Sequence, residues 1–244
     1  MTGFDENIIE VEGLTKAFGA FKAVNEISFE VKRGEIFGFL GANGAGKTTA
    51  MKMLIGISTP TSGKASVAGF DVFTSAEDIK KSIGYMSQKF ALYDDLTVQE
   101  NITFFGGIYG LKRQQIKQKA TKLIEELGLN GIENQLVGSL PLGWKQKISF
   151  SVAMLHEPKI VFLDEPTGGV DPITRRQFWE MIYKAADEGT TIFVTTHYMD
   201  EAEYCNRVSI MVNGKIEALD SPQRLKEQFK VSNMNDVFLK LARG

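Results

Sequence analysis

One stretch decides how this chain folds: Gly41-Ala42-Asn43-Gly44-Ala45-Gly46-Lys47-Thr48-Thr49. It fits the phosphate-binding pattern G-x-x-x-x-G-K-[ST], and its surroundings fit as well. Residues 35–40 read as a short buried strand, and residues 47–57 carry Met51, Leu54 and Ile55 at helical spacing. A strand therefore runs into a glycine-rich turn that opens a helix, which disfavours a chance match to the pattern.

The chemistry of this stretch points to bound phosphate. Glycine lets the backbone curl so that successive N–H groups converge on one anion, and a helix N-terminus adds about half a positive charge. In such a loop Lys47 reaches the β- and γ-phosphates of a nucleotide, and the hydroxyl of Thr48 holds Mg²⁺.

Length and composition are those of an ordinary globular protein. The 244 residues are enough for one large domain or two small ones, and 43% are hydrophobic and 24% charged. The 28 basic and 30 acidic residues give a net charge of −2, which argues against a broad nucleic-acid footprint although a local basic patch fits within it.

Location and redox chemistry follow from what the sequence lacks. No apolar run approaches the roughly 18 residues of a membrane span, and residues 1–7 are acidic and polar rather than signal-like, so we expect a cytoplasmic chain. Cys205 is the only cysteine, which excludes an intrachain disulfide and a cysteine-based metal site. We expect a small buried residue there, with a catalytic thiol as the second choice.

Strands are predicted on both sides of the phosphate loop. Residues 8–14 form a weak strand and residues 27–31 alternate as a half-buried one, so an antiparallel β layer precedes the loop. Later strands are predicted at 64–67, 83–88, 160–163 and 190–195, and residues 207–218 read as a hairpin around Asn213-Gly214.

Helices dominate the middle of the chain. Residues 98–109, 114–127 and 143–156 show helical periodicity, a further helix spans 172–186, and residues 222–244 look like two short amphipathic helices. The predicted fold is α/β, with a parallel, RecA-like P-loop core, an N-terminal antiparallel β part and a helical insertion. We expect one domain over 1–244, with its core at 1–88 and 157–220, the helical part at 89–156 and the tail at 221–244.

A second acidic cluster follows the strand at residues 160–163. Ligands of open α/β sheets bind at such strand ends. There Asp164 can meet Mg²⁺ through water, and Glu165 can polarise a water for attack on a γ-phosphate. Two solvated acids are the alternative, which the phosphate loop disfavours.

Together these motifs resemble the nucleotide-binding domain of an ABC transporter, over nearly the whole chain. Residues 41–49 match Walker A, residues 160–164 match Walker B, and residues 168–171 (Gly-Gly-Val-Asp) match the D-loop. The resemblance implies catalytic roles for Lys47, Gln88, Glu165 and His197, and metal ligands in Thr48, Gln88 and Asp164. It implies that ATP is bound by Phe18, which stacks on the base, by Gly41, Ala42, Asn43, Gly44, Ala45, Gly46, Lys47, Thr48 and Thr49, and by Leu140, Pro141, Leu142, Gly143, Trp144 and Asp171.

In that family two domains face each other head to tail, and each ATP lies between one Walker A and the other subunit's signature loop. The usual signature is Leu-Ser-Gly-Gly-Gln, whereas residues 140–144 here read Leu-Pro-Leu-Gly-Trp. Pro141 supplies neither a hydroxyl nor a backbone N–H. Either the loop works through the backbone donors near Gly143, or this domain needs a different partner with a complete signature. Trp144 either packs locally or faces the opposing nucleotide, and Gly168-Gly169 departs from the commoner Ser-Ala or Ser-Gly.

The sequence is similar to a bacterial branch of multidrug exporter ATPases, which implies a separate membrane permease and attachment to the cytoplasmic face of the membrane through it. The permease would dock near residues 88–101, where Phe90, Leu92 and Tyr93 offer apolar contacts, although each is equally a candidate for the core. One alternative is a soluble ABC ATPase acting on ribosomes or DNA, which the single cassette and the lack of a basic tract disfavour. Another is a module that binds ATP without hydrolysing it. The transported substrate cannot be read, because the permease selects it.

Overall fold

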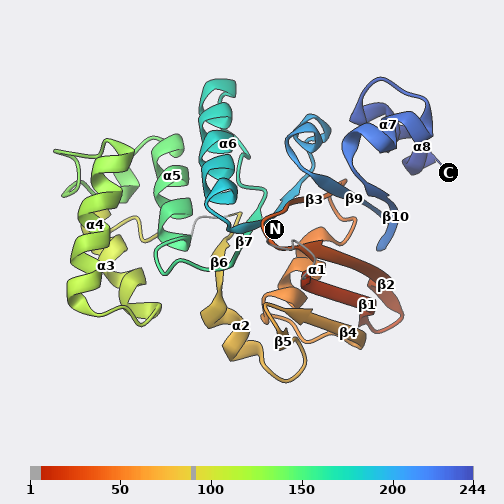
Figure 1. Cartoon of the computed structure of the whole chain (residues 1–244), viewed down its shortest axis with the longest axis horizontal. Coiled ribbons are helices and arrows are strands. Elements are labelled where there is room, and N and C mark those ends of the chain that lie inside the picture. Colours follow the sequence, from red (N-terminus) through yellow and green to blue (C-terminus); the bar gives the residue numbers. More distant parts are fainter. Residues whose placement is uncertain (1–6, 89–91, 244) are drawn as a thin grey trace, which may run out of the picture.

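The computed structural model describes residues 7–88 and 92–243. Within them the chain forms one four-stranded and one six-stranded sheet, with helices around both (Figure 1). The predicted α/β class with an antiparallel β part and a helical insertion is confirmed. The finer division into 1–88 with 157–220, 89–156 and 221–244 stays a prediction. No described helix is both long and apolar enough to cross a membrane.

The antiparallel sheet has the order β2-β1-β4-β5. Its strands are β1 (Asn7–Phe18), β2 (Phe21–Lys32), β4 (Ser62–Val67) and β5 (Phe70–Asp71). The predicted strands at 8–14 and 27–31 are confirmed, but both run longer and form one hairpin that turns at Gly19-Ala20. The sequence pattern misses the extensions because exposed residues of the hairpin interrupt the alternation.

The second sheet has the order β10-β9-β3-β8-β7-β6, and all neighbours except β9 and β10 are parallel. Its strands are β3 (Ile36–Gly41), β6 (Ile83–Met86), β7 (Ile160–Asp164), β8 (Thr191–Thr196), β9 (Arg207–Val212) and β10 (Lys215–Asp220). Every residue of β3, β7 and β8 is buried, as expected for a parallel sheet covered on both faces. The C-terminal ends of these three strands therefore lie side by side.

Aromatic packing joins the two sheets. Phe29 of β2 lies 5.6 Å from Phe37 and 6.3 Å from Phe193 between ring centroids, and the latter two belong to β3 and β8. Helix α1 (Lys47–Leu54) completes this core with Met51 and Leu54. Because these rings are fully or nearly fully buried, burial of apolar area holds the strand ends rigidly in place.

The opposite face of the parallel sheet is covered by α6 (Pro172–Asp187) and by the C-terminal helices α7 (Pro222–Phe229) and α8 (Met234–Arg243). Phe178 and Trp179 of α6 are buried there against the sheet. The predicted helix at 172–186 and the two tail helices are confirmed.

The middle of the chain forms α3 (Val98–Ile108), α4 (Arg113–Leu127) and α5 (Leu142–Ala153), with a 3₁₀ turn at Val137–Ser139. These helices share their own hydrophobic cluster, and α3 and α4 lie at the end of the molecule opposite α7 and α8 (Figure 1). The third helix ends at Ala153, earlier than the predicted 156. Pro158 disfavours a helical residue before it, and Glu157 has a positive φ of 57°.

The sequence analysis missed four short elements: β5, α2 (Ala76–Ser82), the 3₁₀ turn at Val137–Ser139 and a 3₁₀ segment at Met199–Tyr204. Helix α2 buries only Ile79, so it has no apolar periodicity to detect.

Candidate functional site

The phosphate loop connects β3 to α1 and is tightly packed. A side chain at Gly46, whose φ is 109°, would place its Cβ 2.3 Å from the carbonyl oxygen of Ala23. One at Gly41 would place it 2.5 Å from the carbonyl oxygen of Met211. Only glycine fits at either position, because both obstacles are backbone atoms. Backbone atoms of the β1–β2 hairpin and of β9 thus pack against the loop and restrict its conformation.

Lys47 begins α1 and folds back across the loop. Its Nζ donates to the carbonyl oxygens of Gly41 at 2.8 Å and Ala42 at 3.2 Å, and it lies 3.5 Å from Glu165 Oε1. The side chain is 4% exposed. Burial lowers the pKa of the ammonium, and the nearby Glu165 carboxylate opposes that shift. A cation held among carbonyl oxygens at this loop is placed to receive phosphate oxygens.

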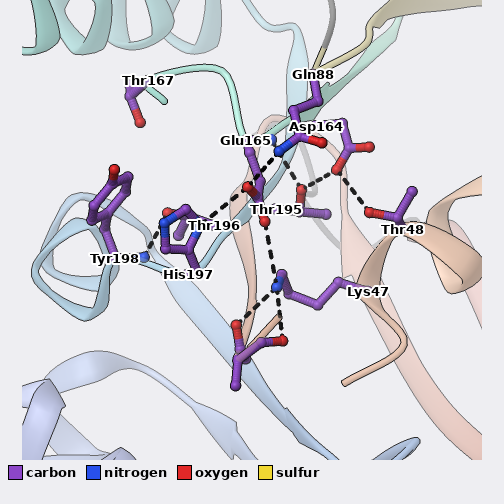
Figure 2. Close-up of polar contacts among 12 residues, drawn as sticks. Lys47, Thr48, Gln88, Asp164, Glu165, Thr167, Thr195, Thr196, His197 and Tyr198 are labelled. Carbon is purple, nitrogen blue, oxygen red and sulfur yellow. Dashed lines mark hydrogen bonds and ion pairs between the residues drawn. The ribbon is translucent and has the colours of Figure 1, made fainter. Parts of the chain in front are cut away.

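Glu165 is the centre of the site (Figure 2). Gln88 Nε2 donates to its Oε2 at 3.0 Å, and His197 Nδ1 lies 3.1 Å from the same oxygen. Its backbone has a positive φ of 48°, and its N–H meets both the carbonyl and the hydroxyl oxygen of Thr195 at 3.1 Å. Gln88 after β6 and His197 after β8 therefore converge on the carboxylate of Glu165, which follows β7.

Asp164, the last residue of β7, is 3% exposed. Its Oδ1 accepts from the hydroxyl of Thr195 at 2.6 Å and from the hydroxyl of Thr48 at 3.4 Å. Burial raises the pKa of this carboxyl, and burial together with Asp164 raises the pKa of Tyr85 to about 12. A buried carboxylate beside a hydroxyl fits Mg²⁺, which prefers a few oxygen ligands from protein along with phosphate oxygens.

A cavity of about 430 Å³ extends from the loop to the hairpin. Its lining residues are Phe18, Phe21, Ala23, Asn43, Gly44, Gly46, Lys47, Thr48, Thr49, Gln88 and Glu165. Phe18 and Phe21 are 59% and 65% exposed. Two exposed rings beside a phosphate loop can cover an adenine base by stacking.

The signature residues lie elsewhere. Pro141, Leu142, Gly143, Trp144 and Asp171 line a separate cavity of about 350 Å³ between α5 and α6. Asp171 caps α6 by accepting from the N–H groups of Ile173 at 3.0 Å and Thr174 at 3.1 Å. Leu140 is 7% exposed in the core of the helical part, so only its backbone can meet a ligand. Within one chain, the structure does not bring these six residues to the phosphate loop.

Comparison with known proteins assigns the chain. The sequence profile of the family described as ABC transporter matches residues 24–168. This chain belongs to the ABC transporter family. It is 49% identical over 91% of its length to the probable multidrug ABC transporter ATP-binding protein YbhF of Escherichia coli, of which it spans only 39%. It is 34% identical over 95% of its length to the linearmycin resistance ATP-binding protein LnrL of Bacillus subtilis, of which it spans 78%.

Solved structures agree with this family. The structure of an ATP binding subunit of an ABC transporter superposes with a TM-score of 0.86 at 27% identity, over 96% of this chain and 99% of that one. Within the ABC transporter family, the chain is therefore an ATP-binding domain.

Residues near the predicted permease groove of this ABC domain divide between core and surface. Leu92 packs partly buried against the helical cluster, which agrees with the core alternative. Tyr93 is 45% exposed and lies 4.9 Å from the ring of Phe104. Trp144 also packs against the helical cluster. Phe90 lies outside the described residues.

Two site residues escaped the sequence analysis. Thr195 holds Asp164 and Glu165 from the neighbouring strand, and its signal is a threonine pair, Thr195-Thr196, directly after the apolar residues 192–194. Phe21 lines the cavity opposite Phe18, and the pairing of the two across a tight turn was the signal.

Proposed function

We propose that this chain binds MgATP in the cavity beside residues 41–49 and hydrolyses it to drive a membrane transporter. One observation carries the proposal: the carboxylate of Glu165 lies between Lys47, Gln88 and His197 at the mouth of a phosphate loop. Phosphoryl transfer needs this combination of a phosphate cradle, a cation and a group that positions water.

In this proposal each side chain has a separate task. Lys47 and the loop N–H groups bind the β- and γ-phosphates, and Phe18 stacks on the base. Thr48, Asp164 and Gln88 would hold Mg²⁺, and the bound ion would neutralise charge on the phosphates. Glu165 accepts the proton of the attacking water, and His197, next to the same oxygen, orients Glu165 and the γ-phosphate.

The donors that complete the site come from a second domain in this proposal. Helix α5 begins at Leu142, and the N–H groups of Trp144 and Lys145 donate to the carbonyl oxygen of Pro141 at 3.0 and 3.2 Å. The N–H groups of Leu142 and Gly143 precede these and have no acceptor within the helix. Pro141 is the residue just before that turn, and its missing N–H is not one of these donors. Backbone donors around Gly143 can therefore bind the γ-phosphate of a facing subunit, which favours a working variant signature over an impaired one.

Transport is proposed from the relatives. YbhF and LnrL are named for multidrug transport and linearmycin resistance, which supports export of small molecules through a membrane permease. The chain would then sit at the cytoplasmic face of the membrane, bound to that permease. Purification of this chain from the cells that make it tests the proposal. Recovery of the chain together with a membrane protein supports the proposal, and recovery together with ribosomes contradicts it.

The variant Glu165→Gln tests hydrolysis. Because the amide cannot accept a proton, we expect turnover to fall about 10²- to 10⁴-fold. ATP binding should persist, since the phosphate loop is unchanged. Phosphate release and equilibrium binding of ATP measure the two effects. Near-normal hydrolysis by this variant would remove Glu165 from its role.

A further inference from the structure

A second set of polar residues lies behind the site, where the loops that follow β7 and β8 meet α6. Glu165 and His197 stand on these two loops, which have irregular backbone. The N–H of Glu165 donates to the carbonyl oxygen of Thr195, but Glu165 and His197 both lie beyond Asp164 and Thr195, the last residues that pair β7 with β8. Their side chains meet at 3.1 Å, and the positive φ of Glu165 is one that a non-glycine residue rarely adopts. Surrounding side chains must therefore hold the two loops.

Glu201 is one of these side chains. It is 0% exposed, and its Oε1 accepts from the hydroxyl of Thr167 at 2.5 Å. Thr167, also 0% exposed, comes two residues after Glu165. A buried carboxylate is costly unless it is paired, so its presence here calls for a specific purpose. It ties the loop after Glu165 to the 3₁₀ segment that follows His197.

Arg175 of α6 completes the connection. Its Nε lies 3.7 Å from Glu201 Oε1, and its Nη1 lies 3.6 Å from Asp200 Oδ2. Its guanidinium carbon lies 4.4 Å from the centre of the Tyr198 ring. A planar guanidinium can pair through its edge and stack through its face at the same time, which lysine cannot do.

Tyr198 links Arg175 to His197 in the site. Its ring centroid is 4.2 Å from that of His197, and its N–H donates to the hydroxyl of Thr196 at 3.0 Å (Figure 2). The chain itself joins Glu165 to Thr167, and contacts then run from Thr167 through Glu201, Arg175 and Tyr198 to His197, which again meets Glu165. The links form a closed circuit. A closed circuit fixes the distance between two groups better than a single tether does.

We propose that Arg175 and Glu201 are positioning residues that set the geometry of Glu165 and His197. The proposal rests on the proposed function, because it assigns the hydrolytic step to that pair. Neither residue lines the cavity beside the phosphate loop, so their loss should leave nucleotide binding intact. A misplacement of about 1 Å at a reacting group can cost about 10²-fold in rate.

The first variant is Arg175→Met, which keeps an unbranched apolar stem and removes the charge and the planar guanidinium. We expect kcat for ATP hydrolysis to fall about 10- to 100-fold, with KM and the number of nucleotide sites per chain unchanged. Arg176→Met is the matched control. Arg176 pairs with Glu180 one helical turn away and is 84% exposed, so its loss should leave kcat unchanged.

Thr167→Val is a second test, which is needed if Arg175→Met fails to fold because it removes a charge beside the buried Glu201. It removes the hydroxyl bound to Glu201 at nearly constant volume, and Thr167→Ser restores that hydroxyl. Under the proposal Thr167→Val lowers kcat, and Thr167→Ser recovers most of it. Thermal unfolding and nucleotide-binding stoichiometry are measured for every variant, and turnover is expressed per bound nucleotide.

Each result decides between the claims. If Arg175→Met and Thr167→Val turn over normally while Glu165→Gln is inactive, the positioning role is wrong and the proposed function stands. Loss of kcat in proportion to lost nucleotide sites also overturns the positioning role, since it reflects folding alone. An active Glu165→Gln, or a wild-type chain that neither binds nor hydrolyses ATP, overturns the proposed function instead.

Discussion

Two faces of this molecule use their polar groups in different ways. The phosphate-loop face comprises residues 41–49 with Gln88, Glu165 and His197, and the signature face comprises residues 140–144 with Asp171. On the first face, Lys47, Gln88 and His197 all turn toward Glu165, and its contacts are complete within one chain. On the second, Asp171 caps its own helix, and Leu140 and Trp144 pack against the helical core. The N–H groups of Trp144 and Lys145 donate to the carbonyl oxygen of Pro141, so those of Leu142 and Gly143 at the start of α5 remain for a ligand.

This difference indicates which face tolerates amino-acid substitution. On the phosphate-loop face the proposed work is shared between loop N–H groups and side chains, and each position that works through its side chain needs one residue type. In our proposal backbone groups do this work on the signature face, so we expect a sequence as unusual as Leu-Pro-Leu-Gly-Trp to keep the function as long as the helix begins at the same place.

The largest expected change in turnover comes from an experiment that tests whether the two faces complete each other across subunits. Glu165→Gln disables the first face, and Gly143→Asp places a carboxylate where the second would meet phosphate. Each variant alone should lose about 10²-fold or more in turnover. Mixed together they should recover about a quarter of wild-type turnover, because random pairing gives half heterodimers with one intact site each. Phosphate release by the mixture measures this.

The binding of ATP by Gly143→Asp alone is the control for folding, since its own phosphate loop is unchanged. An inactive mixture of two variants that both bind ATP would contradict the head-to-tail arrangement.

The second effect concerns Lys47. Removal of its ammonium in Lys47→Ala takes away a charged hydrogen bond to phosphate worth on the order of 1.5–3 kcal/mol, so ATP affinity should fall about 10- to 100-fold. Lys52→Ala is the matched control, because Lys52 is an exposed residue in the last turn of the same helix. Equilibrium binding of ATP measures both. Equal affinities in the two variants would contradict the role of Lys47.

These two faces also differ in how far sequence predicts them. The glycine loop and the two acids at the end of β7 are local patterns, because the backbone shape and the helix start are encoded within a few residues. The structure accordingly brings Lys47, Thr48, Asp164 and Glu165 together as predicted.

Contacts between distant segments are harder to predict. Thr195 meets Asp164 because β7 and β8 are parallel neighbours in register, and Arg175 meets Glu201 because α6 packs over the loop after β8. Neither contact follows from a spacing along the chain. The 3₁₀ segment at Met199–Tyr204 is missed for the same reason, since buried contacts of Met199, Glu201 and Ala202 define it rather than a period.

A third effect is smaller and lies at the base end of the cavity. Phe18→Ala removes one stacking surface, and stacking on an aromatic side chain is worth on the order of 1–3 kcal/mol per base, so ATP affinity should fall about tenfold. Phe73→Ala is the control, because Phe73 is also an exposed ring but does not line the cavity. If Phe18→Ala binds ATP normally and Phe21→Ala does not, the base stacks on Phe21 instead.

The smallest effect concerns the most unusual residue of the signature. Pro141→Ser restores the hydroxyl that the common signature has. If the backbone N–H groups of α5 already bind the γ-phosphate, the added hydroxyl should raise kcat less than about tenfold, the value of one hydrogen bond to a charged group. Titration of ATPase activity against protein concentration, for wild type and variant, measures it. A wild-type chain that stays inactive at every concentration, and that Pro141→Ser activates, would show that backbone donors do not suffice and that the natural partner is a different domain.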